Sequence, residues 1–139
     1  MDVEAMAAIA VDAGLKIHQE LGPGLLESAY EAVLAHVLVQ RGLAVERQKL
    51  IAIRYESLTI DAGFRADLLV GNQLLIELKS TDRLLPVHGK QLFTYLRFMD
   101  LRLGLLMNFG GATFREGLKR VVNPHANLAN QRPSVAPSD

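Results

Sequence analysis

The chain is organised around the stretch Asp67-Leu68-Leu69-Val70-Gly71-Asn72-Gln73-Leu74-Leu75-Ile76-Glu77-Leu78-Lys79. Two apolar runs meet at a Gly-Asn pair, which is the pattern of a β-hairpin. Three charged side chains, Asp67, Glu77 and Lys79, are set into these otherwise apolar strands. Burying a charge is costly unless it is paired or binds an ion. The hairpin is therefore the first place to look for chemistry.

The length of the turn decides whether the two carboxylates face each other. A two-residue loop, Gly71-Asn72, would send Asp67 and Glu77 to opposite faces of the sheet. A three-residue loop that also includes Gln73 sets the carboxylates directly opposite, with Cβ atoms about 4.5–5.5 Å apart. We predict the three-residue loop or an equivalent bulge. Because like charges opposite one another destabilise a sheet unless a cation lies between them, this geometry argues for a metal.

The residues around the hairpin predict three helices and three further strands. The spacing of apolar residues predicts helices over 6–21, 26–40 and 87–99, and the first of these should bury Leu15 and Leu21. Strands are predicted over 45–55, 101–109 and 113–122, with 101–109 central and covered on both faces. In the first arm of the hairpin, simple alternation puts one set of residues on a common face: Phe64, Ala66, Leu68 and Val70.

Length and composition indicate one globular domain. The chain has 139 residues, of which 50% are hydrophobic, and 15 Lys plus Arg balance 15 Asp plus Glu. A nucleic-acid partner must therefore be held by a local patch, since there is no global basic field. No cysteine is present, so any metal would be held by carboxylates, His or carbonyls. We predict a domain over 1–123 and a flexible tail over 124–139. With neither a membrane span nor a signal peptide in the pattern, a cytoplasmic location is expected.

The charged residues of the hairpin suit metal-assisted phosphodiester cleavage. Asp67 and Glu77 can bind Mg²⁺ or Mn²⁺, with the backbone carbonyl of Leu78 as a further ligand. The Lys79 ammonium can orient the attacking water or help to deprotonate it. By itself the D-x₉-E-x-K pattern is equally typical of a surface ion pair. A Gln and a Tyr four residues apart on the helix over 87–99 share a face and can reach toward the hairpin; they are Gln91 and Tyr95.

A further motif, Gly24-Leu25-Leu26-Glu27-Ser28-Ala29-Tyr30, makes a family resemblance specific. From its first helix to Asn123 the chain resembles the GxxExxY proteins of the PD-(D/E)xK nuclease-like superfamily. The resemblance is carried, in order, by 11–30, Glu77-Leu78-Lys79, 86–91 and 104–110. It implies an α/β fold with a restriction-endonuclease-like core, a mixed central sheet flanked by helices in α-β-β-β-α-β order.

The resemblance also implies roles for individual residues. Glu27 corresponds to the first-motif carboxylate, Asp67 and Glu77 to the metal-binding pair, and Lys79 to the catalytic lysine. The QxxxY motif of RecB-type and lambda-exonuclease-like members, which assists the active site and contacts DNA, corresponds to Gln91 and Tyr95. Ala66 stands where the superfamily name has Pro.

The resulting hypothesis is a Mg²⁺- or Mn²⁺-dependent nuclease that cleaves DNA, with RNA as an open alternative and a homodimer as a compatible state. A second hypothesis is a catalytically silent module that binds nucleic acid or regulates another protein. A third is a homo-oligomer whose hairpin charges form only an ion-pair network. Seen singly, Glu27 could simply complement the helix dipole and Tyr95 could be a core residue. Whether His18 and Arg65 belong to the site is left open.

Overall fold

The computed structural model describes residues 1–127, and the part of the predicted tail from 128 onward lies outside the described residues. Along the chain it contains three α-helices, five strands and one short 3₁₀ helix. The helices are α1 (Val3–Leu21), α2 (Glu27–Gln40) and α3 (Pro86–Met99), with η1 at Arg115–Gly117. The strands are β1 (Val45–Tyr55), β2 (Leu58–Val70), β3 (Leu74–Lys79), β4 (Leu103–Asn108) and β5 (Leu118–Val122).

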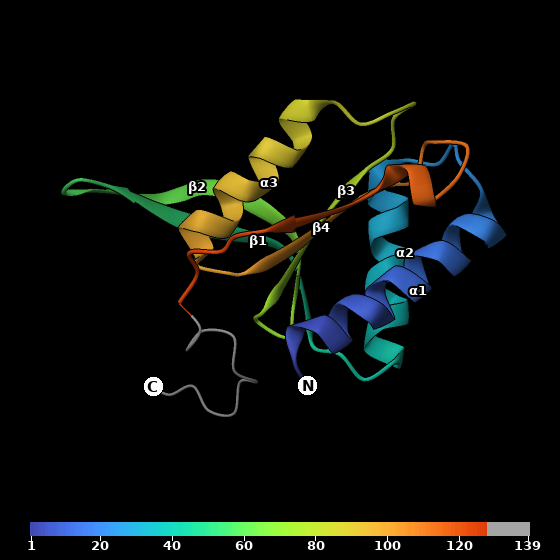
Figure 1. The fold of residues 1–139 in the computed structure, drawn as a ribbon, viewed down its shortest axis with the longest axis horizontal. Coiled ribbons are helices and arrows are strands. Elements are labelled where there is room, and N and C mark those ends of the chain that lie inside the picture. Colours follow the sequence, from blue (N-terminus) through green and yellow to red (C-terminus); the bar gives the residue numbers. More distant parts are fainter. Residues whose placement is uncertain (128–139) are drawn as a thin grey trace.

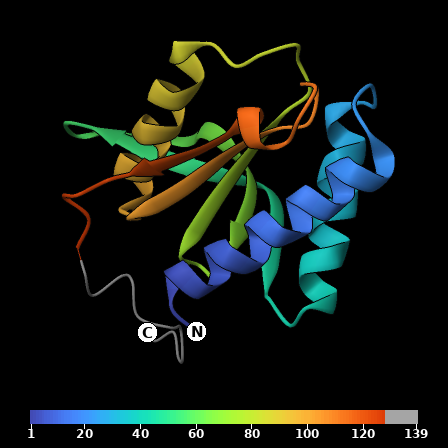
Figure 2. The ribbon, with the colours of Figure 1, turned by 45° about the vertical axis from the view of Figure 1, so that its right-hand side comes forward.

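The strands form one mixed sheet in the order β1-β2-β3-β4-β5. Strands β3 and β4 are parallel, and the other neighbours are antiparallel. The first two helices cover one face of the sheet and α3 covers the other, as Figures 1 and 2 show. Each face has its own hydrophobic cluster. In the described part of the chain, no helix is both long and apolar enough to cross a membrane.

The three-residue hairpin loop predicted between β2 and β3 is confirmed. Strand pairing runs from Val70 opposite Leu74 to Leu68 opposite Ile76, so the same register continued by one step sets Asp67 opposite Glu77. Gly71 and Asn72 both have positive φ, 57° and 56°. Those dihedrals suit Gly and Asn, which enter the left-handed region most readily.

The predicted facing of β2 is wrong in one respect. Leu68 and Val70 pack in the cluster beneath α1 and α2, whereas Ala66 packs in the cluster beneath α3. Phe64 also lies on the α3 side, because its ring stacks on Tyr95 with centroids 4.0 Å apart. The alternation therefore changes phase between Ala66 and Leu68, at the position of Asp67.

Strand β1 changes phase at the matching point. Its pairing with β2 keeps one register from Arg47 opposite Leu68 to Lys49 opposite Ala66, and between them Gln48 has φ 51°. A left-handed residue reverses the side of the strand on which the next side chains project. Gln48 and Asp67 are thus two opposed irregularities in neighbouring strands, which simple alternation cannot predict.

Other differences are local. Helix α1 begins at Val3, and its Leu15 and Leu21 are exposed, because the buried stripe follows Met6, Ala10, Ala13 and Ile17. Only 118–122 of the strand predicted over 113–122 forms, after η1. Strand β4 is buried throughout, as predicted, but it lies one place from the middle of the sheet, which β3 occupies. The far part of the β1–β2 hairpin projects past α3 and is largely exposed (Figure 1).

Gly71→Ala tests whether this loop sets the register. At φ 57° an alanine is strained by about 1–2 kcal/mol, and its Cβ would also lie 2.4 Å from the Met6 methyl carbon. We expect the free energy of unfolding in urea to fall by about that amount. The matched variant Asn72→Gly, at φ 56°, should not be destabilised. Equal stability of Gly71→Ala and wild type would contradict this account of the loop.

Candidate active site

Two carboxylates replace backbone pairing where β2 and β3 diverge. The Asp67 amide donates to Glu77 Oε2 at 2.8 Å, and the Leu78 amide donates to Asp67 Oδ2 at 2.9 Å. Each side chain therefore satisfies a main-chain N–H of the opposite strand, which would be costly to leave unpaired at this depth. The exchange fixes both carboxylates beside one another at the end of the ladder.

The surroundings of Glu77 favour the neutral form of its carboxyl group. Burial, and after it the neighbouring charge of Asp67, raise the pKa of the Glu77 carboxyl to about 8. The hydrogen bond from the Asp67 amide and the Lys79 ammonium act in the opposite direction but do not outweigh them. A second positive charge at this position would therefore be strongly favoured.

Helix α2 brings Glu27 to the same place. Glu27 is the first residue of α2, where the helix dipole favours a carboxylate. It lies at the surface, but partial burial still raises its pKa; the Lys79 ammonium lowers it, and Asp67 raises it. The carboxyl of Glu27 is therefore close enough to Lys79 and Asp67 for both charges to affect its pKa.

Tyr30, one turn after the start of α2, holds the loop before this helix. The Tyr30 hydroxyl donates to the Gly22 carbonyl and accepts the Leu25 amide at 3.1 Å. Its fully buried ring stacks on Phe109, with centroids 4.7 Å apart. The Ser80 hydroxyl, directly after β3, donates to the Leu25 carbonyl at 2.7 Å. The loop that leads to Glu27 is therefore tied both to the core and to the strand that carries Glu77.

Helix α3 contributes the aromatic side of the site. Burial, followed by the charges of Glu77 and Asp67, raises the pKa of the Tyr95 phenol. Its ring stacks on Phe64 of β2. The hairpin carboxylates therefore act electrostatically on Glu27 from one side and on Tyr95 from the other. Gln91 lies one turn before Tyr95 and is exposed.

Two polar residues near the site escaped the sequence prediction. Glu31, one turn after Glu27, is 4% exposed and forms an ion pair with Arg47 at 3.1 Å. Gln48 donates from Nε2 to both Glu31 and Asp67. A charged residue on a helix is normally read as solvated. The four-residue spacing from Glu27 was the available signal, because it places both carboxylates on one helix face.

Among the described residues, His18 and Arg65 form no hydrogen bond or ion pair with the carboxylates of the site. His18 is buried, its Nε2 lies 3.0 Å from the Gly111 carbonyl oxygen, and its ring packs near Phe109 and Phe114. Those contacts give it a structural role at the C-terminal end of α1. Arg65 is exposed on β2 opposite Leu50.

The donor set can be compared with what a metal requires. Within residues 1–127, no group of three or more His, Cys, Asp or Glu side chains is already arranged to hold an ion. Asp67 and Glu77 supply two adjacent carboxylates, and the Leu78 carbonyl is a candidate oxygen ligand beside them. Mg²⁺ keeps several waters and commonly takes only one or two carboxylates. The residues therefore fit a hydrated Mg²⁺ or Mn²⁺ and would not form a closed cage.

The raised pKa predicts how pH affects the metal-free protein. Because the folded pKa of Glu77, about 8, exceeds the ordinary value of 4.5, its contribution to stability is fully present below that value and is lost as pH rises through about 8. Between about pH 5 and about pH 9 in EDTA, wild type should lose on the order of 4 kcal/mol more than Glu77→Gln. Thermal unfolding across that range measures the difference. If the free energy of unfolding depended on pH in the same way for the two proteins, the pKa of Glu77 would not be raised in the folded state.

The comparison with known proteins agrees with the fold. Residues 4–121 match the sequence model of a family described as the PD-(D/E)XK nuclease superfamily, and this span includes every residue of the site described above. Neither the curated proteins nor the solved structures compared with the chain gave a match. The five-stranded mixed sheet flanked by helices is consistent with the core of that superfamily. The chain belongs to the PD-(D/E)XK nuclease superfamily.

Proposed function

We propose that the protein is a metal-dependent nuclease of the GxxExxY type that hydrolyses phosphodiester bonds in DNA, using Mg²⁺ or Mn²⁺. The observation that carries the proposal is the pair of carboxylates, Asp67 and Glu77, fixed side by side at the end of the β2–β3 ladder with Lys79 in electrostatic range. Membership of a nuclease superfamily makes nucleic acid the expected substrate.

Each residue has a role that follows from its surroundings. Asp67, Glu77 and the Leu78 carbonyl would hold the cation, and Glu27 would bind or position it from the start of α2. A divalent cation bound there supplies charge for the scissile phosphate and lowers the pKa of bound water. Lys79 extends from the same strand as Glu77 and would orient or help deprotonate the attacking water. Strand β3 therefore carries both a cation ligand and the group that acts on the nucleophile.

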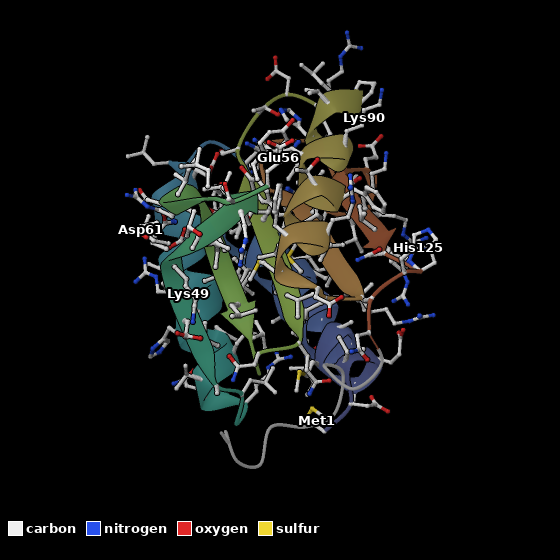
Figure 3. The ribbon with its side chains drawn as sticks, turned by 90° about the vertical axis from the view of Figure 1, so that its left-hand side faces the viewer. Met1, Lys49, Glu56, Asp61, Lys90 and His125 are labelled. Atoms are coloured by element: carbon white, nitrogen blue, oxygen red, sulfur yellow. The ribbon has the colours of Figure 1, made fainter. Side chains whose placement is uncertain are left out.

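Helix α3 would steady the substrate. Gln91 and the basic residues Lys90 and Arg97 are exposed on this helix, and Lys90 stands at its outer end in Figure 3. Tyr95 lies deeper, beside the carboxylates. Since the formal net charge is zero, DNA would be held by this local surface, and a homodimer would enlarge it. We expect the protein to act in the cytoplasm, where DNA is accessible to it.

Cleavage of DNA during Mn²⁺ and Mg²⁺ titration tests the proposal. Wild type should cut in a metal-dependent manner, and Lys79→Ala and Asp67→Ala should each lose at least about a hundredfold in rate. The matched controls are Lys16→Ala and Asp12→Ala, which remove a Lys and an Asp that pair at 3.1 Å on the exposed side of α1. These controls should cut as wild type does.

The outcome also separates the alternatives. Cleavage that is unchanged in both site variants would overturn the assignment of the site. DNA binding without cleavage under either metal would instead favour the silent binding module. Folded variants are needed for either conclusion, so circular dichroism and the unfolding midpoint of each protein should be recorded beside its rate.

A further inference from the structure

The Gln48 side chain joins two carboxylates that come from different elements. Its Nε2 donates to Oδ1 of Asp67 at 3.2 Å and also to Oε1 of Glu31, which is 4% exposed on α2. Asp67 Oδ2 accepts the Leu78 amide on its other side, at 2.9 Å. Both oxygens of the Asp67 carboxylate therefore have a donor, and its plane is fixed from two directions.

Only one orientation of the Gln48 amide is compatible with these neighbours. The amide has two N–H donors on Nε2 and an acceptor oxygen, and both of its partners are carboxylates that accept. Turning the amide over would set its oxygen against two negative oxygens. The contact with buried Glu31 thus fixes the direction in which Gln48 donates to Asp67.

The donor that reaches Asp67 is neutral. The nearest cation of this network, Arg47, pairs with Oε2 of Glu31 at 3.1 Å, on the α2 side. A guanidinium on Asp67 would offset its charge and compete with a metal, whereas an amide orients the carboxylate and leaves the charge in place. Glu31 therefore holds the amide in place and engages Arg47 at the same time.

The backbone conformation of Gln48 also directs its side chain toward Asp67. Gln48 has φ 51° in the middle of β1, a region that costs a non-glycine residue about 1–2 kcal/mol. The strand pairs on either side, Arg47 with Leu68 and Lys49 with Ala66, keep their register. The strained residue thus lies directly opposite Asp67, and its side chain extends toward both α2 and β2.

From these contacts we propose that Gln48, held by Glu31, is a positioning residue that orients the Asp67 carboxylate for a divalent cation. The inference rests on the proposed metal-dependent function and adds two residues to it. Neither would touch the substrate. They would act only by setting the orientation of the two Asp67 carboxylate oxygens.

Gln48→Asn gives the sharpest test. Asn tolerates positive φ better than most residues, and its amide is one methylene too short to span the two carboxylates. Mn²⁺ binding measured by calorimetry should weaken by about tenfold, and half-maximal DNA cleavage should need correspondingly more Mn²⁺. The unfolding midpoint in EDTA should fall, since the substitution also removes the Gln48 donor from buried Glu31, so Mn²⁺ affinity is compared at a temperature where both proteins are fully folded.

A matched control separates the lost amide from a change in backbone strain. Glu56→Gly relieves a second left-handed residue, at φ 54°, in the turn between β1 and β2, on the projecting end that faces the viewer in Figure 3. Its Mn²⁺ affinity should equal that of wild type. Glu31→Gln, which removes the buried charge, should weaken Mn²⁺ binding in the same direction as Gln48→Asn.

The outcomes distinguish the positioning role of Gln48 from the proposed metal-dependent function. If wild type binds Mn²⁺ and Gln48→Asn binds it equally well, the positioning role is overturned and the proposed function stands. If Gln48→Asn weakens binding and Glu56→Gly does not, the positioning role is supported. If wild type does not bind Mn²⁺ at millimolar concentration, the metal site and the inference built on it both fail.

Discussion

Asp67 and Glu77 face each other across two neighbouring strands, and each accepts a main-chain N–H from the other's strand. The arrangement satisfies the backbone, but burial and, after it, the neighbouring charge of Asp67 raise the pKa of Glu77 to about 8. A sheet gains nothing from such a pair that an ordinary backbone ladder would not supply. The arrangement would become favourable if a cation shared the two carboxylates, which is the basis of the function proposed above.

The fold brings a separate support to each side of this pair. Strand β3 supplies Glu77 and Lys79 from the interior of the sheet, and the loop before α2 is tied to the residue after β3 through Ser80. Tyr30 anchors the same loop to the core. On the other face, the stack of Phe64 on Tyr95 joins β2 to α3. Both halves of the site therefore rest on packed elements whose relative positions the hydrophobic clusters maintain.

Much of the fold could be predicted because its signals are local. Gly71-Asn72 predicts the turn, and the demand that Asp67 and Glu77 share a face selects its length; the observed register agrees. What could not be predicted depends on contacts distant in sequence. Gln is not a residue that indicates positive φ, so nothing local signals the phase change at Gln48 in β1. Nothing local signals the matching change at Asp67 in β2 either, and that change places Ala66 on the opposite face from the one expected. Glu31 was missed for the same kind of reason, since its burial follows from Arg47 and Gln48, which come from β1.

We propose that a divalent cation binds between Asp67 and Glu77, where the β2–β3 ladder ends. Anomalous diffraction from a crystal soaked in Mn²⁺ tests it most directly, because the signal identifies the ion and its ligands together. We expect one peak between Asp67 and Glu77, within about 2.0–2.6 Å of oxygens from both. A fully occupied Mn²⁺ elsewhere on the molecule, with no peak between these carboxylates at saturating concentration, would contradict it.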